Sequence, residues 1–279
     1  MEPNSLRNKA MGESTSARAV LTVLARNAVG GIVTVDEAAS LFGLSRRSTA
    51  VRLAALARRG WLARVHRGLY YVLPLESSAG EAVVAPDPWV LALRLFSPCY
   101  IGGWSAAEHW GLTEQLFRST FVVTAAAVRN RSPRLLGTEF HLVRVRPDRV
   151  VGTAPVWRGA VRVPVSDRER TIADALVDPT WAGGIRHLTD ILKTYAAQKS
   201  SNFPKILEYL GDATRAAGIK RFGFLLERLF PTETALILTS HARRSTGVIR
   251  LDPSIRSKGR LLKRWGLWVN ASIPSSDDE

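Results

Sequence analysis

The sequence contains one cysteine in 279 residues, Cys99. A lone cysteine cannot form an intrachain disulfide, and it offers no thiolate cluster for a structural zinc ion. We therefore predict that Cys99 is a packed core residue and that the protein works in a reducing compartment.

Long hydrophobic runs are also absent. No stretch approaches the roughly 18 consecutive apolar residues that suggest a membrane-spanning helix. The first residues, MEPNSLRNKAMGESTSAR, lack the apolar centre of a signal peptide. These two absences predict a cytoplasmic protein that does not associate with a membrane.

Signatures of metal, phosphate and cofactor sites are missing as well. The five histidines are dispersed without an H-E-x-x-H spacing, and neither a P-loop nor a G-x-G-x-x-G occurs. Two Pro-Asp pairs begin like a metal-dependent nuclease motif, but no acidic-x-Lys strand follows them, so both are predicted to be turns. They are Pro86-Asp87 and Pro147-Asp148. We expect no metal ion, no cofactor and no catalytic residues, and hence not an enzyme.

Three carboxylates close together in sequence, Asp167, Glu169 and Asp174, resemble an acid–base set. Asp167 is a good N-cap for the helix that follows, and arginines stand beside the carboxylates. We therefore predict structural ion pairs here rather than acid–base catalysis.

Charge is the strongest signal that is present. The chain carries 39 Lys and Arg against 24 Asp and Glu, a formal net charge of +15. The first 75 residues hold 11 basic and 4 acidic side chains, which gives this N-terminal quarter an excess of seven positive charges. An excess of this kind indicates a polyanionic partner.

The N-terminal quarter begins with an amphipathic helix. Apolar residues in SARAVLTVLARN recur at helical spacing, Ser16 is a possible N-cap, and Gly30-Gly31 ends the pattern. Residues 1–15 before this helix are expected to form a flexible terminus.

Two further helices meet across a tight turn. Thr34 and Glu37 form a capping box that begins the second helix, and Gly43 ends it. Ser45 can then cap a third helix, Arg46 to Arg59. This order and spacing are typical of a helix-turn-helix.

The third helix has two different faces at 100° per residue. One face is apolar or small and can pack on the other helices: Thr49, Ala50, Leu53, Leu56 and Ala57. The opposite face is basic and polar: Arg47, Ser48, Val51, Arg52, Arg58 and Arg59. After Gly60, the segments WLARV and LYYVL read as strands joined by a turn at His66, Arg67 and Gly68. Residues 16–76 are therefore predicted to form a winged helix-turn-helix domain.

An exposed helix of this kind fits the major groove of DNA, where arginine pairs bidentately with guanine. We predict base contacts from Arg47 and Arg52, with Ser48 and Val51 beside them, the latter against a thymine methyl. The remaining arginines are expected on phosphates. The whole expected interface is Ser45, Arg46, Arg47, Ser48, Val51, Arg52, Arg58, Arg59, His66, Arg67 and Gly68. The alternatives are a solvated helix face and a winged helix that docks protein.

The rest of the chain is predicted to be a larger mixed α/β domain, so that the fold class is α+β. Residues 77–87 form a linker, 88–270 the C-terminal domain and 271–279 an acidic tail. Strands are expected in TFVVTA, EFHLVRV and AVRVPVS, and a helix in DRERTIADALVDP. From Gly184 onward the pattern is mostly helical.

Five motifs in a fixed order resemble the AbiEi-type antitoxins of bacterial abortive-infection, or type IV toxin–antitoxin, systems. The resemblance covers roughly residues 16 to 270. The motifs are RRGWLARVHRGLYYVLP, YIGGWSAAEHWGLTEQ, VPVSDRERTIADALVDPTWAGGI, GFLLERL and KRWGLWVN.

The resemblance implies a transcriptional autorepressor whose winged helix binds double-stranded DNA at inverted repeats in its own promoter. It also implies a C-terminal domain that counteracts a nucleotidyltransferase-like toxin. By motif, DNA contact falls on residues 45–52 and on the wing at 66–68. The protein is expected to be a monomer or weak dimer that can bind DNA cooperatively. The family supplies no catalytic residues.

A second basic run near the C-terminus is left with three interpretations: a solvated face, a second DNA contact, or a patch for an acidic toxin surface. Its members are Arg243, Arg244, Arg256, Lys258, Arg260, Lys263 and Arg264. For the chain as a whole, two alternatives to an autorepressor remain. One is a nuclease targeted by a winged helix, and the other is a regulator whose large domain senses a small molecule.

Overall fold

The computed structural model describes residues 17–73, 86–211, 216–233 and 247–273. It divides into two compact units. The first comprises residues up to Leu95 together with Arg134–Glu139 and Trp157–Val163, and the second comprises the remainder. No helix in the described ranges is both long enough and apolar enough to cross a membrane.

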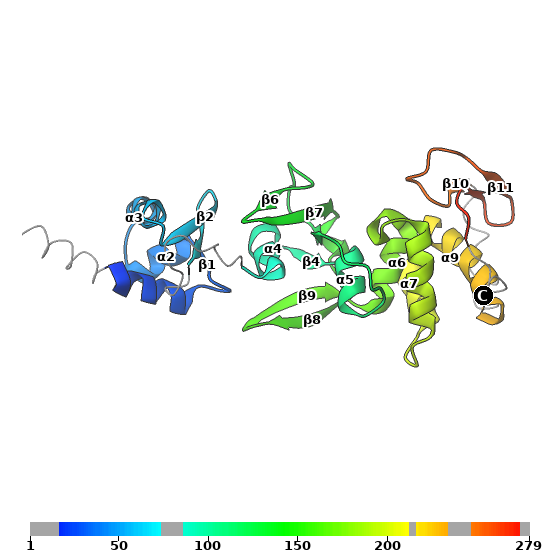
Figure 1. Ribbon diagram of the computed structural model, residues 1–279, viewed down its shortest axis with the longest axis horizontal. Helices are drawn as coiled ribbons and strands as arrows, with labels where there is room; N and C mark the ends of the chain where they lie inside the picture. Colours follow the sequence, from blue (N-terminus) through cyan, green and yellow to red (C-terminus); the bar gives the residue numbers. More distant parts are fainter. Residues whose placement is uncertain (1–16, 74–85, 212–215, 234–246, 274–279) are drawn as a thin grey trace, which may run out of the picture. The chain divides into compact units, whose positions relative to one another are not determined.

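The first unit contains a small module of helices and a three-stranded sheet (Figure 1). Residues 17–27 are helical. The later elements are β1 (Ile32–Thr34), α2 (Val35–Phe42), α3 (Arg46–Arg58), β2 (Leu62–His66) and β3 (Leu69–Val72). The strand order is β1-β3-β2, and both pairings are antiparallel. This is the predicted winged helix-turn-helix.

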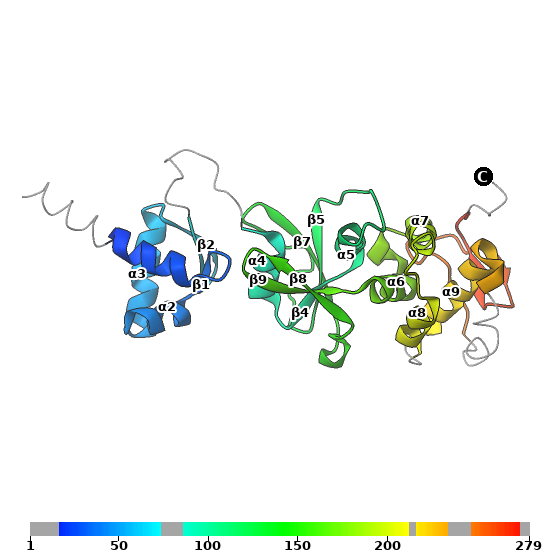
Figure 2. The same cartoon turned by 90° about the horizontal axis from the view of Figure 1, so that it is seen from below.

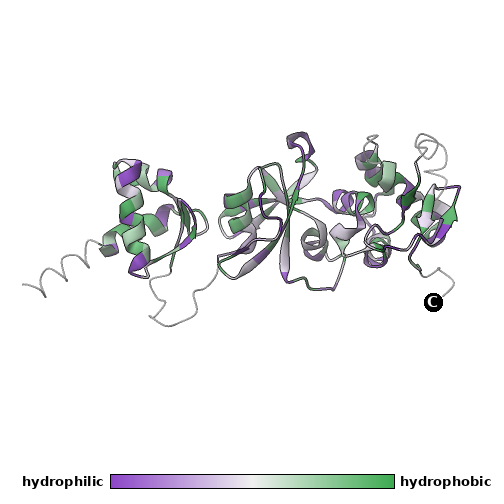
Figure 3. Cartoon of the chain, turned by 90° about the horizontal axis from the view of Figure 1, so that it is seen from above, coloured by the Kyte–Doolittle hydropathy of each residue, from purple (hydrophilic) through white to green (hydrophobic). Residues whose placement is uncertain are grey.

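The core of the module draws on every one of its elements. Leu24 comes from the first helix, Ala38 from α2 and Leu53 from α3, and all three are fully buried. Leu62 and Tyr70 close the core from the wing strands. In Figure 3 the helices of this module carry both hydrophobic and hydrophilic residues, as amphipathic helices require.

Strand β1 was not predicted from the sequence. The Gly30-Gly31 pair does end the first helix, with φ angles of 60° and 77° that favour glycine. The next three residues then pair with β3, where Ile32 lies opposite Tyr71. Three residues are too few to show an alternating pattern.

A mixed sheet of six strands follows, in the order β6-β7-β5-β4-β9-β8. Its strands are β4 (Cys99–Ile101), β5 (Ser119–Thr124), β6 (Arg134–Leu135), β7 (Thr138–Arg144), β8 (Thr153–Arg158) and β9 (Val161–Ser166). The three predicted strands are β5, β7 and β9. Central strand β4 was missed because all three of its residues are buried and show no alternation. Its Cys99 is the predicted core residue, and burial raises the pKa of the thiol to about 11.

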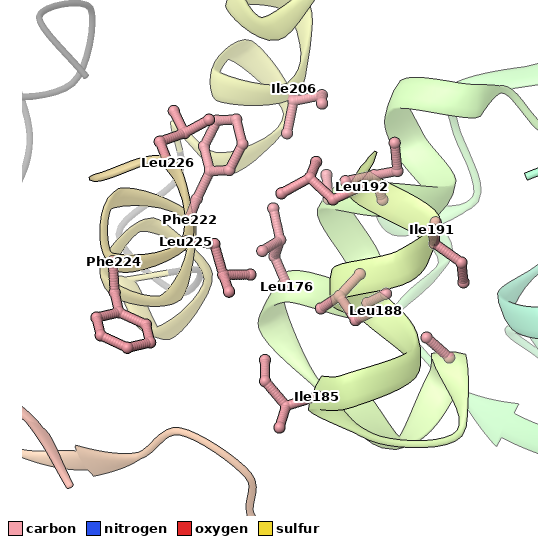
Figure 4. Close-up of a cluster of buried hydrophobic side chains, with 14 of the residues drawn as sticks. Leu176, Ile185, Leu188, Ile191, Leu192, Ile206, Phe222, Phe224, Leu225 and Leu226 are labelled. Atoms are coloured by element: carbon pink, nitrogen blue, oxygen red, sulfur yellow. The ribbon is translucent and has the colours of Figure 1, made fainter. Parts of the chain in front are cut away.

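Helices make up most of what remains, and α6 and the helices after Gly184 agree with the prediction. They are α4 (Pro88–Phe96), α5 (Gly103–His109), α6 (Arg168–Val177), α7 (Ile185–Ala196), α8 (Phe203–Leu210) and α9 (Ala216–Leu229). Figure 2 shows α6, α7, α8 and α9 gathered in one group. Their shared core is drawn in Figure 4, where Leu176 lies among side chains of the neighbouring helices, including Leu188 and Leu225.

The described chain ends in a small sheet beside α9. Strands β10 (Ile249–Arg250), β11 (Arg260–Leu262) and β12 (Leu267–Val269) take the order β10-β12-β11. Buried Trp265 and Leu267 join this sheet to the helical core. Gly223 on α9 permits the approach, because a Cβ at this position would lie 2.0 Å from an indole carbon of Trp265.

Candidate nucleic-acid interface

The turn between α2 and α3 is fixed by caps at both of its ends. Thr34 Oγ1 accepts a hydrogen bond from Glu37 N, and the Glu37 carboxylate accepts one from Thr34 N, which completes the predicted capping box. Gly43 ends α2 in the left-handed conformation, with φ 62°. Ser45 Oγ then accepts from Ser48 N at 3.1 Å and starts α3. The two helices are thus held in the helix-turn-helix arrangement.

Helix α3 packs through one face and exposes the other, as its sequence predicts. Thr49, Leu53 and Leu56 are buried against the rest of the module. On the opposite side Arg47 is exposed, and Val51 keeps 64% of its surface in solvent. A valine exposed to this extent in a helix is available for an apolar contact with a partner.

The wing is tied to the helices by its own turn. Strands β2 and β3 are joined at Arg67 and Gly68, and Gly68 has φ +83°. The carbonyl of Gly68 accepts a hydrogen bond from the backbone N–H of Val35, the first residue of α2. A shift in register between Arg64 and His66 marks a bulge in β2. The tip of the wing therefore has a fixed position beside the helix-turn-helix.

Together α3 and the wing line a groove with a volume of about 710 Å³, which we call the wing groove. Helix α3 contributes Arg46, Arg47, Ala50, Val51 and Ala54, and the wing contributes Arg64, Arg67, Gly68 and Tyr70. Four guanidinium groups thus border one groove. Arg46 forms an exposed ion pair with Asp36 at 2.8 Å. The other three arginines have no ion-pair partner in the described part of the chain.

The remaining residues expected at the interface lie around the groove rather than in its lining. The Arg52 guanidinium stacks over the Phe42 ring, 5.1 Å from its centroid, on the side of α3 that faces α2. Arg59 lies over Trp61 at 5.8 Å, and Arg58 is exposed. The Ser45 hydroxyl donates to Ser48 Oγ at 2.9 Å, which leaves the Ser48 O–H available as a donor. His66 is exposed beside Arg67.

Sequence reasoning did not select Arg64. In a regular strand Arg64 would lie on the same side as buried Leu62, two residues away. The bulge before His66 breaks this alternation, so that Val65 is buried and Arg64 is exposed. Its position in the basic segment WLARVHRG was the only available signal.

The three carboxylates of the second unit are engaged in ion pairs and caps, as predicted. Asp167 caps α6 by accepting from Arg170 N at 2.7 Å, and it also binds Lys205. Glu169 accepts from the same Lys205 ammonium at 3.1 Å. Asp174 pairs with Arg170 at 2.7 Å, where both side chains are buried.

Both Pro-Asp pairs are structural, as predicted. Asp87 Oδ1 accepts from the first N–H groups of α4, and Pro147–Arg149 forms a single 3-10 turn. Among the residues that the structure describes, no three His, Cys, Asp or Glu side chains are grouped as metal ligands.

The members of the second basic run lie in different surroundings. Arg243 and Arg244 lie outside the described residues. Arg256, Lys258 and Lys263 are exposed, with Lys258 positioned over the Trp268 ring at 5.9 Å. Arg260 and Arg264 are also exposed, and they line a pocket beside α9.

Two capped helices, an exposed basic recognition helix and a basic wing define a winged helix-turn-helix module of the type found in transcription regulators. Residues 19–72 match the model of a family described as "Transcriptional regulator, AbiEi antitoxin". The match confirms the resemblance to AbiEi antitoxins over these residues, which contain most of the first of the five motifs. No curated protein matches the chain.

The fold of nearly the whole chain is similar to a crystal structure of the RV2827C protein from Mycobacterium tuberculosis. The TM-score is 0.63 at 20% sequence identity, over 91% of this chain and 90% of the other. At this level of identity the likeness concerns the fold alone.

Proposed function

We propose that the protein is a sequence-specific DNA-binding repressor of its own operon and the antitoxin of that operon. The family match supports a role as an antitoxin and transcription regulator. The wing groove is the observation that carries the DNA-binding part of the proposal, because it collects four guanidinium groups on one exposed surface.

The electrostatic balance of the groove favours a polyanion. Asp36 is the carboxylate paired there, and its ion pair with Arg46 is exposed on both sides, at 73% and 69%. Exposed pairs of this kind contribute at most about 1 kcal/mol. A phosphate can therefore replace Asp36 at little cost, and each arginine that binds a phosphate releases condensed counterions.

The shape of the groove separates the roles of its residues. Arg47 and Val51 lie one turn apart on the exposed stripe of α3, so we assign them to base edges in the major groove. Arg46, Arg64 and Arg67 border the groove and are assigned to phosphates. Arg52 stacks on Phe42, and we assign it first to holding α3 against α2 and second to a flanking contact.

The partners follow from this assignment. An inverted repeat presents two half-sites, so we propose that two copies bind one operator, each through its own winged helix. The second proposed partner is a nucleotidyltransferase-like toxin encoded in the same operon, which the protein counteracts directly or indirectly. Since both proposed partners are cytoplasmic, we propose that the protein acts in the cytoplasm.

Fluorescence anisotropy with the protein's own promoter duplex tests the DNA-binding part. The control is a duplex of the same length and composition with a scrambled sequence, at the same salt concentration. Specific binding is expected to be tighter by about 10³-fold or more. Equal dissociation constants for the two duplexes would overturn sequence-specific recognition.

The antitoxin part is tested separately in cells. Co-expression with the neighbouring toxin gene should restore growth that the toxin alone arrests. Growth arrest that persists at full expression of the soluble protein would contradict the proposal.

A further inference from the structure

A pocket of about 550 Å³ lies between α9 and the C-terminal sheet, within the second unit. We call it the α9 pocket. Its apolar walls include Phe224 from α9, Leu262 and Val269 from the sheet, and Ile273 near the end of the described chain. The volume is in the range of sites for small organic ligands, roughly 300–1,000 Å³.

Local geometry explains why these side chains converge. On α9, Phe224 and Arg228 are four residues apart and so project from the same face. On β11, Arg260 and Leu262 alternate with Leu261 and share one face of the strand. Arg260 lies opposite Val269 of β12, which adds a second apolar residue to the same wall.

The charges in the pocket do not cancel. The Glu227 carboxylate is occupied, since it accepts from the Arg264 guanidinium and from the indole N–H of Trp265. Arg228 donates through Nε to the carbonyl of Ile273. Its two terminal amino groups have no partner in the described part of the chain.

Arg260 adds a further positive charge to the pocket. Its guanidinium has neither an ion pair nor a hydrogen bond to any residue that the structure describes. The pocket thus combines an apolar interior with unpaired guanidinium donors. Guanidinium groups bind carboxylate and phosphate oxygens through two parallel hydrogen bonds.

We propose that the α9 pocket binds an organic anion, with an apolar body against Phe224 and Leu262 and an anionic head group on Arg260 and Arg228. The apolar walls beside the arginines distinguish this partly open site from a contact for the DNA backbone, which needs polar donors and no apolar pocket. Two members of the second basic run, Arg260 and Arg264, are then residues of a ligand site. The proposal does not depend on the winged helix binding DNA.

The probe for the test is 8-anilinonaphthalene-1-sulfonate, an aromatic body with one anionic head, whose fluorescence rises in an apolar site. Full-length protein should give a saturable titration. Arg260→Ala should weaken binding by about fivefold or more, since a charge-assisted hydrogen bond is lost. Arg256→Ala is the matched control, because it removes the same charge from an exposed position outside the pocket. Circular dichroism melts establish that both variants remain folded.

Competition identifies the chemistry of the site. Naphthoate and phenyl phosphate should displace the probe, whereas inorganic phosphate at equal concentration and the promoter duplex should not. Displacement by inorganic phosphate to the same extent would show a simple anion site and overturn the proposal. Displacement by DNA would assign the arginines to nucleic acid instead. The proposal also fails if Arg256→Ala weakens binding of the probe as much as Arg260→Ala does, or if the fluorescence titration of the wild-type protein does not saturate.

Discussion

Arg47 is the residue on which the proposed recognition of sequence most depends. Its guanidinium is exposed on α3 and has no ion-pair partner among the described residues, so its substitution removes no interaction that holds the fold. Arg47→Ala should weaken binding to the promoter duplex by about 1–3 kcal/mol, with a much smaller loss on the scrambled duplex. Anisotropy titrations measure both losses.

Arg26→Ala provides the control, because it removes the same charge from an exposed position on the first helix. Arg52→Ala is the informative second variant. If a variant loses the same affinity on both duplexes, the arginine that it replaces contacts a phosphate rather than a base.

Asp252 has a long-range structural role. Helix α7 follows Gly184, which provides no side-chain cap, and Asp252 Oδ2 instead accepts from the N–H of Ile185 at 2.9 Å. Burial by itself would raise the pKa of Asp252. Hydrogen bonds from Ile185 and Ser254, together with the Arg221 charge, lower it below its ordinary value.

The lowered pKa of Asp252 predicts how stability depends on pH. The charged form stabilises the fold above the unfolded-state pKa of about 4, and this contribution disappears as the pH falls through the lower folded-state value. Asp252→Asn should therefore cost about 1–2 kcal/mol at pH 7 and progressively less in acid. Urea unfolding at pH 7, 4 and 3 measures the change. Asp190→Asn, exposed on α7, should cost little at any pH, and a constant Asp252 effect would contradict the argument.

At the scale of elements, the wing is expected to contribute affinity without choosing the sequence. Arg64 and Arg67 border the wing groove from β2 and its turn. Each substitution to alanine should reduce the slope of log K against log salt by about one, with the preference between duplexes unchanged. Titrations over a range of salt concentrations give the slope. An unaltered slope for both variants would remove the wing from the interface.

Helix α9 offers a test of packing between elements. Alanine has the higher helix propensity by about 1 kcal/mol, yet a Cβ at Gly223 would lie 2.0 Å from the Trp265 ring. We expect Gly223→Ala to lower the free energy of unfolding by about 1–3 kcal/mol through overpacking. Denaturant unfolding should be measured for Gly223→Ala, for Trp265→Leu and for the double variant. The double variant should lose less stability than the sum of the two single losses, because leucine makes room for the new methyl group. A stabilised Gly223→Ala variant would contradict close packing of α9 against Trp265.

The sequence was most informative where the signals were local. Capping residues such as Thr34 and Ser45 and the turn at Gly43 predicted α2 and α3, because each forms its contacts within a few residues. Contacts between distant segments left no such signal. The bulge that exposes Arg64 depends on pairing with β3, and the α9 pocket depends on Arg260 lying opposite a helix that ends some thirty residues earlier.

At the scale of the whole molecule, the winged module should function apart from the rest. Its core draws only on residues within 17–72, so a fragment of residues 1–76 should fold and prefer the promoter duplex. We expect its affinity and salt dependence to be lower than those of the full chain, because one module contacts few phosphates. Circular dichroism and anisotropy measure folding and binding.

The complementary fragment, residues 88–279, should neutralise the toxin without repressing the promoter. Co-expression of each fragment with the toxin and a promoter reporter separates the two activities. Rescue of growth by the N-terminal fragment, or repression by the C-terminal one, would show that the activities are not divided between them in this way.

The strand order β1-β3-β2 also determines when this module can finish folding on the ribosome. Strand β1 emerges first but pairs with β3, which is synthesised about forty residues later. At elongation rates of about 5–20 residues per second, Ile32 and Val33 wait roughly 2–8 s for their partners. Until then the nascent chain exposes two apolar residues that are fully buried in the finished protein. A pause in translation before Leu69 has left the ribosome would prolong this exposure and favour capture by chaperones, whereas a pause after Val72 has left it would not.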